Sequence, residues 1–85
     1  MIRIYFVFDN PLDDDGVTLS YVDVPTQDPT EAFGRVADAA ESGELWHSLY
    51  PDEKEHPYTL IESKMLYLDI STLAHEQHAE TTLAF

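Results

Sequence analysis

The chain contains no cysteine. Disulfide bridges, thiolate catalysis and cysteine-ligated zinc are therefore excluded as sources of stability or chemistry. Long apolar runs are also missing, because the hydrophobic start of the chain ends at Asp9 and is too short for a signal sequence or a membrane span. We therefore expect a soluble, cytoplasmic protein that does not bind a membrane.

Cationic residues are scarce, with 4 Lys and Arg against 17 Asp and Glu, which gives a formal net charge of −13. The carboxylates occur in every third of the chain, so the acidity belongs to the whole surface. Phosphates repel such a surface, which disfavours direct binding to nucleic acid or anionic lipid and favours a basic protein surface as partner. The hydrophobic fraction of 44% argues against disorder. Residues 1–85 should thus form one small acidic domain.

The best-defined local pattern is a helix between Asp28 and Gly43. Asp28 is a typical N-cap, Pro29 suits the first helical position, and Glu31 stands in the capping-box place. Gly43 can adopt the left-handed conformation that ends a helix. An apolar stripe at helical spacing predicts the buried face, with Phe33 as its largest side chain, and consists of Phe33, Val36, Ala37 and Ala40.

Two segments before this helix have the alternating pattern of strands. In residues 2–8 the apolar side chains expected to face the core are Ile2, Ile4, Phe6 and Phe8. Residues 17–24 alternate again and are rich in β-branched residues. Between them, residues 9–16 contain Asn, Pro, three consecutive Asp and Gly, which are typical of a chain reversal. The sequence therefore predicts an antiparallel hairpin.

The segments after the helix are less regular. Residues 44–50 suit one or two helical turns that bury Trp46. Residues 58–70 are strand-like but longer than a usual strand. A single straight strand would place Glu62 and Lys64 on the same face as several leucines, so a tight turn or a bulge is expected near Ser63. We expect two strands, 58–62 and 65–70, rather than one.

These elements predict an α+β fold in the order β-β-α-(short α)-β-β. An antiparallel sheet of three to five strands would carry one main helix packed on one face. The tail, residues 71–85, contains a possible short helix and a possible edge strand. We expect it either to be mobile or to dock, on its own sheet or on a second copy in a homodimer.

No motif of catalytic chemistry stands out, so we expect neither an enzyme nor a cofactor. His75 and His78 are three residues apart, one short of the spacing in metalloprotease helices, and two nearby ligands make them only weak candidates for a metal site. Asp13 and Asp15 resemble part of a calcium loop, but the bidentate glutamate expected at its end is Val22. The sequence therefore predicts no dedicated metal site.

The first functional hypothesis is a DNA mimic whose carboxylates replace phosphates and so block a nucleic-acid-binding protein. Alternate residues on one face of a strand are about 6.6 Å apart, close to the phosphate spacing of one DNA strand. In size and charge balance the chain is similar to phage-encoded inhibitors of restriction and CRISPR systems. The candidate binding carboxylates form two groups, which are Asp13, Asp14 and Asp15 in the first loop, and Asp38, Glu41 and Glu44 near the helix end.

The alternative is a regulatory or assembly module that binds one protein partner. Tyr5 points away from the predicted core face, and tyrosines often dominate binding interfaces, so Tyr5 is the aromatic interface candidate. The order strand, acidic turn, strand and helix in residues 1–43 resembles HicB-type antitoxins, although a third strand before the helix is absent. Under this hypothesis the acidity would serve solubility or adaptation to a salt-rich cytoplasm.

Overall fold

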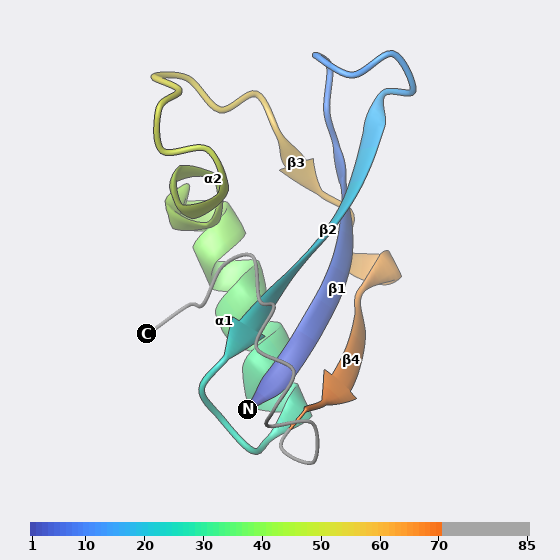
Figure 1. Ribbon diagram of the computed structural model, residues 1–85, viewed down its shortest axis with the longest axis vertical. Coiled ribbons are helices and arrows are strands. Elements are labelled where there is room, and N and C mark those ends of the chain that lie inside the picture. Colours follow the sequence, from blue (N-terminus) through green and yellow to red (C-terminus); the bar gives the residue numbers. More distant parts are fainter. Residues whose placement is uncertain (71–85) are drawn as a thin grey trace.

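The central strand of the sheet is β1, Ile2–Asp9, in a computed structural model that describes residues 1–70 (Figure 1). Strand β2, Val17–Val24, pairs with it in antiparallel fashion along its whole length. The other edge of β1 pairs with two short antiparallel strands, β3 at Thr59–Leu60 and β4 at Leu66–Asp69. This arrangement confirms the predicted α+β fold with an antiparallel sheet.

Helix α1, Pro29–Ser42, begins and ends as its sequence predicts. Oδ1 of Asp28 accepts a hydrogen bond from the Thr30 N–H at 2.9 Å, and Gly43 ends the helix with a φ of 88°. The capping-box prediction for Glu31 is wrong. Its carboxylate accepts hydrogen bonds from the Thr26 hydroxyl and from Arg35, and these contacts lower the pKa of Glu31.

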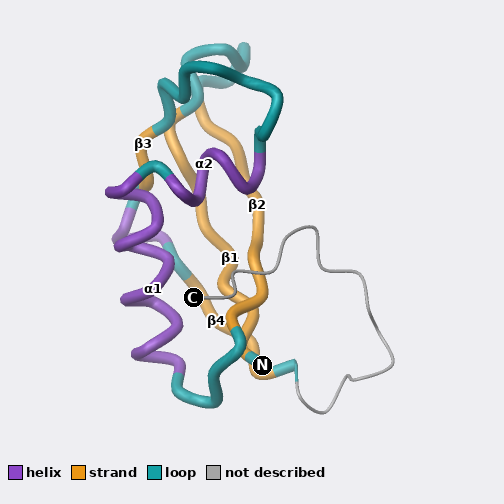
Figure 2. The backbone as a smooth tube through the Cα atoms, turned by 90° about the vertical axis from the view of Figure 1, so that its left-hand side faces the viewer, coloured by secondary structure: helices purple, strands orange, loops and turns teal. Residues whose placement is uncertain are grey.

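Helix α2, Glu44–Leu49, follows directly after Gly43 and confirms the predicted second helix. Both α-helices lie on the same side of the sheet (Figure 2). Buried and half-buried residues alternate along β1, and the four side chains that face the helices have 0% exposure, as predicted for Ile2, Ile4, Phe6 and Phe8.

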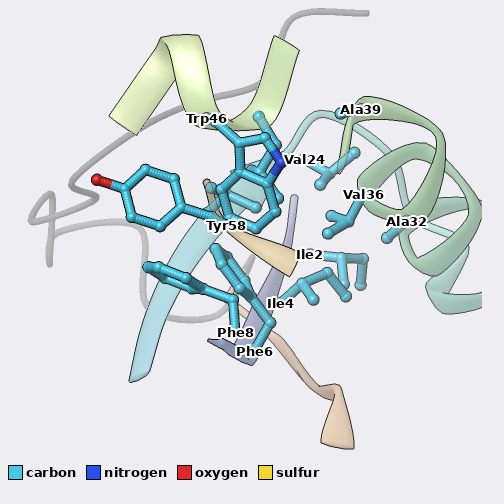
Figure 3. Packing of buried hydrophobic residues seen from close by; sticks show 12 residues of the cluster. Ile2, Ile4, Phe6, Phe8, Val24, Ala32, Val36, Ala39, Trp46 and Tyr58 are labelled. Atoms are coloured by element: carbon cyan, nitrogen blue, oxygen red, sulfur yellow. The ribbon is translucent and has the colours of Figure 1, made fainter. Parts of the chain in front are cut away.

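The core has an aliphatic half and an aromatic half (Figure 3). Ile2, Ile4 and Val36 lie in the aliphatic half, against α1. In the aromatic half the ring of Phe8 lies 5.0 Å from Trp46 and 5.3 Å from Tyr58, between ring centroids. The prediction that Trp46 belongs to the core is thus confirmed.

The predicted buried face of α1 is confirmed at Val36 but not at Phe33, Ala37 and Ala40, which are only partly buried. The buried residues of the helix are Ala32, Val36 and Ala39, whereas Phe33 is only half-buried. Small alanines at the contact let the helix approach the sheet closely. Phe33 lies at the flank instead, where its ring packs edge-on against Tyr67 of β4 at 5.8 Å.

The strand-like segment after residue 58 is split, as preferred from the sequence, but not by a hairpin turn. A short 3-10 helix, Glu62–Lys64, separates β3 from β4, and both strands pair with the same edge of β1. Leu60 is opposite Phe8 and Leu66 is opposite Tyr5. The chain therefore advances six residues between β3 and β4 while β1 advances only three. The three extra residues form a large bulge.

Because three is an odd number, the bulge reverses the faces of the strand that follows it. Leu60 shares the helix-side face with Phe8, whereas Leu66 and Leu68 share the opposite face with Tyr5 and Arg3. The expected interruption near Ser63 is thus confirmed, and it places Leu60 on the opposite face from Leu66 and Leu68. This reversal creates the surface described next.

The predictions made for the tail, including its docking and the candidate ligands His75 and His78, concern residues 71–85 and lie outside the described residues. Within residues 1–70, neither helix is long and apolar enough to cross a bilayer.

Candidate functional site on the outer face of the sheet

The side of the sheet opposite α1 and α2 carries a set of apolar side chains, here called the outer patch. Strand register places its members next to one another, because directly opposite residues of antiparallel strands point to the same side. Leu19 and Leu66 are each 69% exposed and Leu68 is 41% exposed. The outer patch consists of Tyr5, Val7, Leu19, Tyr21, Leu66 and Leu68.

Tyr5 is at the centre of the outer patch. On β1 it lies between Tyr21 of β2 and Leu66 of β4, and the two tyrosine rings are 5.6 Å apart. The sequence-based choice of Tyr5 as an outward aromatic residue is thus confirmed in its orientation. Exposed leucines around a pair of tyrosines are typical of a surface that binds another macromolecule.

An ion pair fixes one end of the outer patch. Nε of Arg3 donates to Oδ1 of Asp23 at 2.8 Å and a second guanidinium nitrogen donates to Oδ2 at 3.2 Å. The guanidinium also lies 4.4 Å from the ring centroid of Tyr21. These hydrogen bonds raise the pKa of Arg3 further above its usual value, and the stacked pair holds the ring of Tyr21 in place.

The opposite end of the outer patch is acidic. Asp9 follows Val7 on the same face of β1, and the loop after it carries Asp14 and Asp15, both exposed. Asp13 has a structural role in this loop, because its carboxylate accepts hydrogen bonds from the Asp15 N–H and the Thr18 hydroxyl. The first acidic group therefore lies at the end of the hairpin (Figure 1).

The second acidic group is on the helix side and does not form one cluster. Asp38 and Glu44 line one shallow pocket of about 310 Å³. Glu41 lines a different pocket with Trp46. All three carboxylates are exposed. Asp38 and Glu44 thus line one pocket and Glu41 lines another, while Glu41 follows Asp38 by three residues on α1.

The leucines of the outer patch were not among the candidates found from the sequence. A straight strand hides them in the core, and only the bulge at residues 62–64 turns Leu66 and Leu68 outward. A signal was present in the charged triplet Glu-Ser-Lys, which interrupts an apolar segment with three residues and so reverses its faces.

Metal binding finds no support in the part of the chain that the structure describes, where no group of three His, Asp or Glu side chains could hold an ion. His47 and His56 have ring centroids 6.4 Å apart near the end of α2. His56 also has a ring nitrogen 3.1 Å from the carbonyl oxygen of Tyr50, which helps to hold the following loop on the helix.

The titration of Tyr58 should make the stability of the fold depend on pH. Burial, together with hydrogen bonds from its hydroxyl to Glu53, raises the pKa of Tyr58 from 10.0 to about 12. A raised pKa in the folded state stabilises the fold below pH 10, and this stabilisation is lost as the pH rises toward 12. The free energy of unfolding, measured in urea between pH 8 and 12, should thus fall more steeply for wild type than for Tyr58→Phe. Equal slopes would contradict the assignment.

Comparison with known proteins gives no match, whether to protein-family models, to curated proteins or to solved structures.

Proposed function

We propose that this protein is a non-enzymatic binding module and that the outer patch docks a basic protein partner. The observation that supports the proposal is the exposure of Leu19, Leu66 and Leu68 around Tyr5, on the face of the sheet opposite α1 and α2. Isolated apolar residues on a surface are ordinary, but several that adjoin one another favour a protein contact.

The charge of the chain selects the class of partner. The formal net charge is −13, and both arginines are engaged in ion pairs with carboxylates, Arg3 with Asp23 and Arg35 with Glu31. A second copy would bring the same negative charge to the interface and would be repelled. A basic protein with an apolar centre would complement the leucines at the contact and would be attracted over a longer range by the negative charge of the chain.

DNA mimicry is a narrower form of this proposal, in which the basic partner is a nucleic-acid-binding protein. Its strand-based version finds no support in the geometry, because β1, β2 and β4 each contain one aspartate and β3 contains no acidic residue. The carboxylates of the two predicted groups lie on loops and helices instead. Competition by duplex DNA for the same partner distinguishes mimicry from other basic partners.

The test uses three leucines of nearly equal exposure. Leu19 and Leu66 belong to the outer patch, whereas Leu12, 71% exposed, lies in the loop after β1 and outside the patch. A partner captured from the source cell is purified, and its affinity is measured for wild type, Leu19→Ser, Leu66→Ser and Leu12→Ser at two ionic strengths. Loss of affinity in the two patch variants, with Leu12→Ser unchanged and binding weaker at high salt, is the expected result.

Two other results would overturn the proposal. Equal loss of affinity in all three variants would show that the outer patch is not the contact surface. Sedimentation of wild type as a salt-dependent dimer that Leu66→Ser dissociates would show that a second copy occupies the patch. In either case Asp14→Asn and Asp15→Asn, which we expect to slow association with a basic partner, provide an independent check on the role of charge.

A further inference from the structure

A pocket of about 240 Å³ lies on the helix side of the sheet, between α1 and β3. It arises because the flank of α1 that faces β3 carries only the small side chains Ala37 and Ala40, and because β3 is two residues long before the chain leaves the sheet at the bulge. The rest of the lining is mixed, because Leu60, Trp46 and Tyr58 contribute apolar and aromatic groups and Thr59 contributes a polar one. The space is large enough for one long side chain of another protein.

Two carboxylates stand at this pocket on different elements. Glu41 is in the last turn of α1 and Glu62 is the first residue of the 3-10 helix. Both side chains are exposed, and neither forms a salt bridge within the described part of the chain. An apolar floor with carboxylates from two sides suits a side chain that has a long aliphatic stem and a cationic head.

We infer that this pocket binds an arginine side chain of the partner, with its stem on Ala37, Ala40 and Leu60 and its guanidinium between Glu41 and Glu62. Arginine fits better than lysine for two reasons. Its planar guanidinium is weakly hydrated and packs on aromatic surfaces, and its several N–H groups can donate to two carboxylates at once. The inference rests on the proposed basic partner, because it names the chemical group that this partner would insert.

The sole tryptophan of the chain provides the readout, because Trp46 lines the pocket. The probe is the peptide acetyl-Gly-Arg-Gly-amide, which has no chromophore of its own. We expect it to change Trp46 emission in a saturable way, with a dissociation constant on the order of 1 mM for so small a ligand. The peptide with citrulline in place of arginine, nearly equal in shape but uncharged, should not bind, and the lysine peptide should bind more weakly.

Three glutamine variants locate the site. Glu41→Gln and Glu62→Gln should each raise the dissociation constant by about two- to fivefold, as is typical of exposed charge pairs. Glu44→Gln removes the same charge from an exposed residue that does not line this pocket, and should bind as wild type does. Equal binding of the citrulline or lysine peptide, or an equal effect of Glu44→Gln, would overturn the inference.

Failure of this inference and failure of the proposed function give different results. If no specific arginine binding is found, but partner affinity is still lost in Leu66→Ser and not in Leu12→Ser, the inference about the pocket is wrong and the proposed role of the outer patch is kept. If arginine binds specifically but Leu66→Ser does not change the affinity for the partner, the proposed role of the outer patch is wrong and the inference about the pocket is kept.

Discussion

Phe8→Ala is expected to lower the free energy of unfolding by about 3–5 kcal/mol. Phe8 is fully buried, and its ring lies among those of Phe6, Trp46, Tyr50 and Tyr58. Truncation would leave a void in the aromatic half of the core, between α2 and the sheet. A domain of this size has roughly 4–13 kcal/mol of stability in total, so the loss is a large share of it. Urea denaturation followed by circular dichroism measures the effect.

The matched control is Phe33→Ala. Phe33 is the same residue type but half-buried at the flank of α1, so its truncation should cost about 1–2 kcal/mol. If Phe8→Ala does not fold, Phe8→Leu keeps most of the volume and gives a measurable, smaller loss. A cost for Phe33→Ala equal to that for Phe8→Ala would place Phe33 in the core, as the sequence first suggested.

Asp23→Ala is the second substitution with a large expected effect, about 3–5 kcal/mol of destabilisation. The side chains of Arg3 and Asp23 are 14% and 2% exposed. Removing the carboxylate therefore leaves a mostly buried guanidinium without its charged partner. The double variant Arg3→Met with Asp23→Leu replaces both charges by apolar groups and should recover most of the loss. Thermal and urea unfolding of the single and double variants measure the difference.

An exposed ion pair on α1, between Arg35 and Glu31, is the control for this prediction. Arg35 and Glu31 are one helical turn apart on α1, and their side chains are 30% and 47% exposed. Arg35→Ala should therefore cost only about 0.3–0.5 kcal/mol. If the double variant at positions 3 and 23 is no more stable than Asp23→Ala, the unpaired guanidinium of Arg3 is not the cause of the lost stability.

Most of the fold could be predicted from local signals. The N-cap at Asp28, the helix end at Gly43 and the alternation of residues 2–8 each depend on neighbouring residues, and each is confirmed. The face of α1 could not be predicted equally well. Phe33 and Ala32 are neighbours on the helix, and which of them faces the sheet depends on how closely the two layers pack, a tertiary property that residue spacing does not contain.

The candidate site was predictable only in part, for a reason of register. Tyr5 is on the outer face because β1 is regular, and its orientation follows from alternation alone. Leu66 and Leu68 are on that face because of an odd number of inserted residues, which no alternation pattern within β4 can show. The net charge favoured acidic residues as candidates. The outer patch is apolar, and only one of the two acidic groups lies beside it.

The central claim is that the outer patch contacts a basic protein, and site-specific crosslinking tests it most directly. A photoreactive phenylalanine derivative replaces Leu66 in one variant and Leu12 in the other, positions with 69% and 71% exposure. The two probes thus differ in location and not in accessibility. We predict that position 66 crosslinks to a basic protein in extracts of the source cell and that position 12 does not. Crosslinks of equal yield from both positions, or crosslinks from position 66 only to a second copy of this chain, would contradict it.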